Sequence, residues 1–195
     1  MPAQPAPYDP RNLQSLFGYG RAAHVRSGGI CQLCGCGKER GIDFDLWRQF
    51  TIEHLVGQGD GGYPDRIRAA VDTKFAGVMS AEDQSKLAHD IHEANIVTAC
   101  QFCNSTTSRH RSPVTMEELI ATGPVDPKGL YESVVQRLQA ILDRKRSIVE
   151  WKLRATRDSF DEQIRPELER RRAEEPALLD PWTLAGLDVE DTAPS

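Results

Sequence analysis

The sequence lacks the features that would place a protein in a membrane or mark it for secretion. Its 195 residues include no apolar run of about 18, the length that a transmembrane helix requires. Residues 1–10 are rich in proline and have no apolar core, which argues against a secretory signal. We therefore expect a cytoplasmic protein that has no membrane partner.

An excess of basic residues is also missing. The chain has 24 Lys and Arg against 29 Asp and Glu, a net charge of −5, whereas nucleic-acid binding usually needs clustered Lys and Arg. Residues 176–195, however, contain four acids and no basic residue, and the remainder has a net charge of −1. The charge therefore does not exclude DNA, and it predicts modest, salt-sensitive binding. We expect a flexible N-terminus at 1–12 and an acidic tail at 176–195.

Cysteine is scarce, and its five residues lie in two short stretches. Disulfides are disfavoured in the cytoplasm, so paired Cys-x-x-Cys motifs indicate a metal or a redox site. The two-residue spacer lets both thiolates of a pair face one ion, and Gly35 permits the tight turn after the first pair. Two pairs supply four sulfurs, a closed tetrahedral site that favours structural zinc. The predicted ligands are Cys31, Cys34, Cys100 and Cys103.

Two alternatives remain open for these cysteines. Either pair alone would also fit a thioredoxin-like redox motif, although the presence of two pairs argues against it. Cys36 lies outside both pairs, and it is either a free thiol or a replacement for Cys34 as a ligand.

Further motifs lie between and beside the cysteine pairs, and the whole set resembles the HNH endonuclease family over roughly residues 29–111. That family combines two Cys-x-x-Cys pairs with an acid–His pair at a strand end and a Gly-Gly turn. An Asn-Leu-like pair precedes the second cysteine pair, and an Asn or His follows it. In this sequence the additional elements are Glu53-His54, Gly61-Gly62, Asn95-Ile96 and Asn104.

The resemblance implies a ββα-metal fold, which is treble-clef-like: a two-stranded hairpin packs on a helix, and zinc ties the two together. Residues 43–47 and 50–52 include aromatic and β-branched side chains and are predicted to form strands, and a helix is expected within 102–111. The predicted fold class is α+β and mostly helical, with the HNH nuclease domain at 13–123.

The resemblance also implies a metal-dependent endonuclease that cleaves or nicks DNA. His54 takes the role of general base, because a neutral imidazole with an ordinary pKa can accept a proton from water near neutral pH. Glu53 and Asn104 supply oxygen ligands to a divalent cation, Mg²⁺ or Mn²⁺, which neutralises the phosphoryl charge. Asn95 is counted with His54 and Asn104 among the catalytic residues, because it holds the loop and orients the histidine.

The sequence departs from the family pattern at three of these positions. Glu53 stands where the family usually has Asp, Gly57 where it usually has Pro, and Thr107 where it often has Lys. Arg109 and Arg111 follow shortly afterwards, and we expect them to take over the phosphate contact of the missing lysine.

Helices are predicted inside and after the motif region. The long gap between Gly62 and Asn95 indicates an insertion at about 63–94, with helices at 64–75 and 80–93. Ser80 followed by Asp83 resembles an N-cap box, and Thr115 with Glu118 reads as a capping box that starts a short helix ending near residue 123.

A C-terminal helical extension is predicted at 124–175. Apolar residues recur at three-to-four spacing from Leu130 to Leu153, which predicts a helix over 128–161. Residues 144–146 (Arg-Lys-Arg) are placed on its polar face, and Pro166 should break or restart the helix. We expect the apolar stripe to pack either on the domain or on another chain, which would be a second copy in a homodimer or a different protein partner. The alternative function is a zinc-stabilised module that binds nucleic acid or protein without cleavage.

Overall fold

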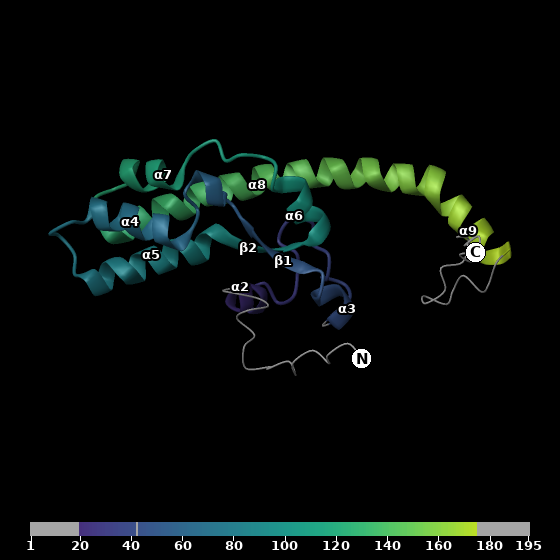
Figure 1. Cartoon of the computed structure of the whole chain (residues 1–195), viewed down its shortest axis with the longest axis horizontal. Coiled ribbons are helices and arrows are strands. Elements are labelled where there is room, and N and C mark those ends of the chain that lie inside the picture. Colours follow the sequence, from purple (N-terminus) through teal and green to yellow (C-terminus); the bar gives the residue numbers. More distant parts are fainter. Residues whose placement is uncertain (1–19, 42, 175–195) are drawn as a thin grey trace, which may run out of the picture. The chain divides into compact units, whose positions relative to one another are not determined.

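The computed structural model describes residues 20–41 and 43–174, which are mostly helical and contain one two-stranded antiparallel sheet (Figure 1). The expected α+β class with a helical majority is confirmed. The predicted flexible N-terminus and acidic tail lie outside the described residues. Within the described residues, no helix is both long enough and apolar enough to cross a bilayer.

In chain order the elements are α2 (Gly20–Arg26), α3 (Phe44–Trp47), β1 (Phe50–His54), the 3₁₀ turn η2 (Gln58–Asp60), α4 (Pro64–Lys74), α5 (Ala81–Asn95), β2 (Ile96–Cys100), α6 (Gln101–Thr107), α7 (Met116–Thr122), α8 (Pro127–Ser159), the π-helical turn η3 (Phe160–Ile164) and α9 (Arg165–Glu174).

The sheet is formed by β1 and β2, although the two strands lie far apart in the chain. Phe50 pairs with Cys100, and His54 at the end of β1 pairs with Ile96 at the start of β2. The strand predicted at 50–52 is confirmed and extends to His54. Helix α6 begins directly after β2 and contacts both strands, so two strands and the helix after them form one substructure (Figure 1).

The strand predicted at 43–47 is wrong, because this segment forms the short helix α3. The side chain of Asp43 accepts a hydrogen bond from the backbone N–H of Leu46 at 3.0 Å. A side-chain oxygen in this position caps the first turn of a helix, which outweighs the β-propensity of the aromatic residues. The second strand of the sheet is therefore β2, beyond the insertion.

The two inserted helices predicted between Gly62 and Asn95 are confirmed as α4 and α5, and in the structure they lie between β1 and β2. Ser80 caps α5: its hydroxyl oxygen accepts from the N–H of Asp83 at 3.1 Å, and the hydroxyl donates to the Asp83 carboxylate at 2.6 Å. The apolar faces of the two helices pack in the core through Ile67, Val71, Leu87 and Ile91, all of them buried.

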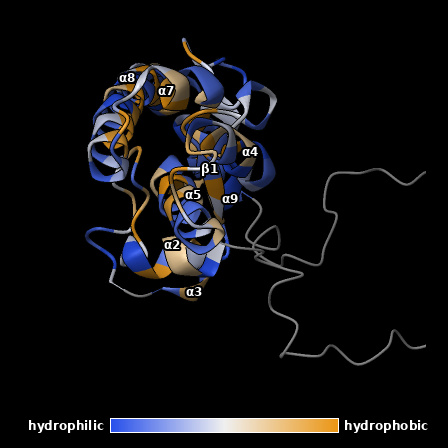
Figure 2. Ribbon diagram, turned by 90° about the vertical axis from the view of Figure 1, so that its left-hand side faces the viewer, coloured by the Kyte–Doolittle hydropathy of each residue, from blue (hydrophilic) through white to orange (hydrophobic). Residues whose placement is uncertain are grey.

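Helices α7 and α8 complete this core. The predicted capping box is confirmed, because Thr115 and Glu118 exchange hydrogen bonds between side chain and backbone at the start of α7. Figure 2 shows hydrophobic residues on α7 and α8 interspersed with hydrophilic ones. The predicted apolar stripe accounts for the buried face of α8, whose apolar members are Leu130, Val134, Leu138, Ile141, Leu142 and Val149.

The chain divides into two compact units between Glu150 and Trp151, inside α8 and inside the helical extension predicted at 124–175. The division falls there because the apolar stripe of α8 is buried with the core of the first unit up to Val149. In the second unit α8 ends in the π-helical turn η3, and α9 starts one residue before Pro166. The helix restart predicted at this proline is confirmed, since proline fits the first turn of a helix but not its interior.

Candidate functional site

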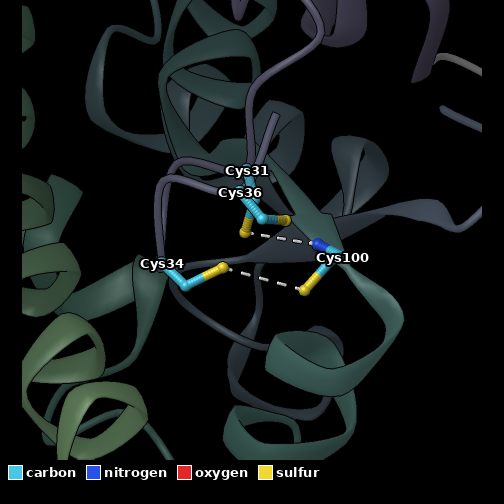
Figure 3. A group of neighbouring side chains, drawn as sticks. All are labelled: Cys31, Cys34, Cys36 and Cys100. Carbon is cyan, nitrogen blue, oxygen red and sulfur yellow. Dashed lines mark hydrogen bonds between the residues drawn. The ribbon is translucent and has the colours of Figure 1, made fainter. Parts of the chain in front are cut away.

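Four cysteine thiols gather where the loop after α2 meets the end of β2 (Figure 3). The sulfurs of Cys31, Cys34, Cys36 and Cys100 all lie within 4.8 Å of one another. Cys34 Sγ and Cys100 Sγ are 3.9 Å apart, and Cys31 Sγ accepts a hydrogen bond from the backbone N–H of Cys100 at 3.3 Å. A group of four thiols at such distances could hold a metal ion such as zinc.

The loop that carries the first three cysteines is held in shape by its own backbone. Gly35 has a φ of +77°, a value that side-chain-bearing residues rarely adopt, and its N–H donates to the carbonyl of Cys31 at 2.8 Å. The turn role predicted for Gly35 is therefore confirmed. Gln32 joins the loop to β2, because its N–H donates to the Thr98 carbonyl at 2.8 Å and its side-chain oxygen accepts from the Thr98 N–H at 3.0 Å.

The cysteine group differs from the predicted ligand set in one member. Cys36, predicted to be a free thiol or a replacement for Cys34, lies in the group together with Cys34. The predicted ligand Cys103 is fully buried beside the group, where hydrogen bonding to it lowers the pKa of Cys100 to about 6. Burial raises the pKa of Cys36 to about 12. Five sulfurs thus converge on this place, and the fourth ligand of a metal would be either Cys36 or Cys103.

A second feature is a cleft of about 500 Å³ in the first unit. It lies at the end of β1 and is lined by η2, α6, the segment after α6, and α8. Three predicted site residues meet there, together with one of the two arginines expected to contact phosphate; the other, Arg109, is exposed outside the lining. Charged or polar residues that line the cleft include Glu53, His54, Asn104, His110, Arg111 and Lys145.

His54 lies at the end of β1 and is only 8% exposed. Its ring centroid is 6.1 Å from that of Tyr63 and 6.2 Å from that of His92. Burial lowers the pKa of His54 to about 4, and the positive charges of His92 and Lys145 act in the same direction. The ordinary pKa expected of a general base at this position is therefore not found: the imidazole is uncharged at neutral pH and can accept a proton, but it is a weaker base than an unperturbed histidine.

Asn95 holds the loop that follows His54. Its side-chain oxygen accepts from the N–H of Val56 at 2.8 Å, and its amide nitrogen donates to the carbonyls of Val56 and Gly62 at 3.1 and 3.2 Å. A Cβ at Gly62 would come within 1.9 Å of the Val56 oxygen, which explains why a glycine is needed there. Asn95 is fully buried, behind the loop rather than among the residues that line the cleft.

Asn104 lies in α6 and lines the cleft. Its amide nitrogen donates to Thr51 Oγ1 at 2.7 Å, which ties α6 to β1. The contact orients the side chain, and it leaves the carbonyl oxygen as the atom that can bind a cation.

Glu53 is buried and forms an ion pair with Lys145 of α8. The Lys145 ammonium donates both to Glu53 Oε1 and to the backbone carbonyl of His54, the latter at 3.0 Å. Thr107 of α6, which stands where the family often has Lys, donates its hydroxyl to the same carboxylate oxygen at 2.9 Å. Helices α6 and α8, both distant from β1 in the sequence, thus hold the Glu53 carboxylate in place.

Lys145 is a site residue that the sequence reasoning missed, and its placement on the polar face of the helix is wrong. Its side chain is 7% exposed. A signal was available, because Lys145 follows Ile141 by four residues and precedes Val149 by four, which continues the apolar stripe. A lone charge on the buried face of a helix requires a partner, and here that partner is Glu53.

Among the described residues, the cleft holds no group of three or more His, Cys, Asp or Glu side chains close enough together to share an ion. The cysteine group is the one set of three or more His, Cys, Asp or Glu ligand atoms that lie close enough together for a shared ion in the described part of the chain. Metal ligation by Glu53 and Asn104 therefore stays a prediction. The chain matches no protein-family model, no curated protein and no solved structure.

Proposed function

We propose that the protein is a metal-dependent endonuclease of the HNH type that hydrolyses DNA phosphodiester bonds, by cleavage or nicking, in the cleft at the end of β1. The observation that carries this proposal is the meeting of Glu53, His54 and Asn104 in one cleft. The cysteine group includes Cys100 at the junction of β2 and α6. The order of two strands followed by a helix is the arrangement that a ββα-metal fold requires.

The proposed chemistry uses the cleft residues in distinct roles. Hydrolysis of a phosphodiester needs an activated water, and the uncharged His54 accepts its proton. A divalent cation, Mg²⁺ or Mn²⁺, would when bound supply charge neutralisation at the phosphoryl oxygens and at the leaving oxygen. Glu53 and the Asn104 carbonyl would hold this cation, since hard cations prefer oxygen ligands. Arg111 lies in the same cleft and would contact a phosphate.

Asn95 acts in this proposal through the loop that it holds. Its three hydrogen bonds connect the peptide after His54 to the Gly61-Gly62 turn, whose neighbours Gly57 to Asp60 line the cleft. Asn95 is thus a positioning residue, and zinc at the cysteine group is likewise structural because four thiolates leave no coordination position open.

Plasmid nicking tests the proposal directly. Supercoiled plasmid is incubated with the full-length protein and Mg²⁺ or Mn²⁺, with EDTA as the metal-free arm. We expect nicking that EDTA abolishes and that His54→Ala reduces by at least about a hundredfold, the usual contribution of a general base. His89→Ala is the matched control, because His89 is exposed on α5 and outside the cleft. If neither the wild type nor His54→Ala nicks the plasmid with either metal, the proposed endonuclease activity is refuted.

One observation favours a second candidate, a zinc-stabilised module that binds DNA or protein without cleavage. The charge of Glu53 is already balanced by Lys145, so the cleft does not require a cation for neutrality. For this module, gel-shift titration should detect salt-sensitive DNA binding by a protein that leaves the plasmid intact.

The homodimer or protein partner expected at the C-terminal helix also stays a prediction. Within the second unit, the apolar side chains of Trp151, Phe160, Ile164 and Leu168 are exposed. Light scattering of the full-length chain and of a chain that ends at residue 150 would reveal whether residues beyond 150 drive self-association.

A further inference from the structure

Lys145 interrupts the apolar stripe of α8 at a buried position. Leu138, Ile141, Leu142 and Val149 surround it on the same helix face, and all of them are buried. Removal of an ammonium group from water is costly, and replacement of a buried ion pair by apolar side chains is often neutral or stabilising. Packing alone therefore does not explain a lysine at this position.

The contacts of Lys145 point to a role at the end of β1. Its ammonium bridges two consecutive residues, the Glu53 carboxylate and the His54 backbone carbonyl. Side chains at consecutive strand positions normally point to opposite faces, yet both of these residues line the cleft. Lys145 and Thr107 both donate to Glu53 Oε1, so Oε2 is the oxygen left for a ligand in the cleft.

We infer that Lys145 is a positioning residue and an internal counter-ion. It holds the Glu53 carboxylate by Oε1, and its positive charge weakens the affinity of Oε2 for a divalent cation. This inference rests on the cation proposed at Glu53. An ammonium fixed on the same carboxylate repels that cation at a distance of a few ångströms, in surroundings that screen charge less than water. By thermodynamic reciprocity, a bound cation weakens the contact between α8 and β1 by the same factor.

Mn²⁺ binding to the zinc-loaded, full-length protein tests this inference without reference to catalysis. The probe is free Mn²⁺, measured at pH 8 from the loss of its electron paramagnetic resonance signal. We expect Lys145→Met to bind Mn²⁺ at least about tenfold more tightly than the wild type, because one nearby positive charge is gone. Lys128→Met is the matched control, since Lys128 lies on the same helix with a side chain that is 86% exposed, and its affinity should not change.

A double variant identifies the ligand that responds. When Lys145→Met is combined with Glu53→Gln, the gain in Mn²⁺ affinity should disappear, because the carboxylate that binds the cation is absent. If Lys145→Met does not fold, as judged by circular dichroism and thermal melting, Lys145→Gln removes the same charge with a polar side chain and should show the same gain.

Two results would overturn the inference: a folded, uncharged variant at 145 with wild-type affinity, or a gain that persists without the Glu53 carboxylate. Plasmid nicking separates this outcome from failure of the proposed function. Tighter Mn²⁺ binding by a protein that never nicks DNA would leave the counter-ion role standing and remove the nuclease. Nicking by the wild type, with no gain in the Mn²⁺ affinity of Lys145→Met, would support the nuclease and remove the counter-ion role.

Discussion

Removal of the Asn95 side chain should destabilise the protein far more than removal of the Asn104 side chain. Asn95 is fully buried and makes three hydrogen bonds, two with Val56 and one with Gly62. Asn104 is half-buried and makes one, with Thr51. The two residues have the same side chain, so substitution of each by alanine compares their surroundings alone.

The magnitude follows from these contacts. Each intramolecular hydrogen bond contributes about 1 kcal/mol, and Asn95→Ala also leaves the buried N–H of Val56 without its acceptor. The expected loss is about 3–4 kcal/mol, against about 1 kcal/mol or less for Asn104→Ala. For a chain of this size, the former corresponds to a fall in melting temperature of roughly 6–16 °C.

Asn95→Asp separates hydrogen bonding from packing, because aspartate has nearly the same volume. Its carboxylate can still accept from the Val56 N–H, but it turns an acceptor toward the two carbonyls that the amide nitrogen now serves. Urea unfolding should therefore show Asn95→Asp at least as unstable as Asn95→Ala at pH 7.

Two results would refute this reasoning. One is a free energy of unfolding for Asn95→Ala that matches that of Asn104→Ala. The other is an Asn95→Asp variant as stable as the wild type. In the nicking assay, Asn95→Ala should lose activity together with stability. Substitution of a residue that acts directly on the substrate would instead lower the activity and leave the stability unchanged.

Three further predictions concern the metal and pH. Elemental analysis should find about one zinc per chain, and chelation should lower the melting temperature, since a structural zinc contributes folding free energy; a folded protein without metal would contradict this. Of Cys36→Ser and Cys103→Ser, the variant that loses zinc identifies the fourth ligand, and retention of zinc by both would mean that either sulfur suffices. Because the pKa of His54 falls from 6.5 to about 4 on folding, its contribution to stability is fully present above pH 6.5 and is lost as the pH falls toward 4. Urea unfolding should show up to about 3 kcal/mol of this loss in the wild type and little of it in His54→Gln.

Several parts of the fold could be predicted because neighbours in the chain determine them. Apolar residues at three-to-four spacing and the caps at Ser80 and Thr115 define α5, α7 and α8, and Pro166 restarts the helix beyond η3. The error at 43–47 has the same local origin, because one capping side chain, Asp43, outweighs the propensity of the residues after it.

The sequence by itself determined the cysteine pairs, the turn at Gly35, the helices and the short list of polar residues from which a site could be built. Tertiary structure alone decided which of them meet. β1 pairs with β2 across the inserted helices, Cys36 joins the thiol group, and Lys145 reaches Glu53 across 92 residues of chain. The physical reason is that periodicity and capping act between near neighbours, whereas an ion pair between distant elements depends on how those elements pack.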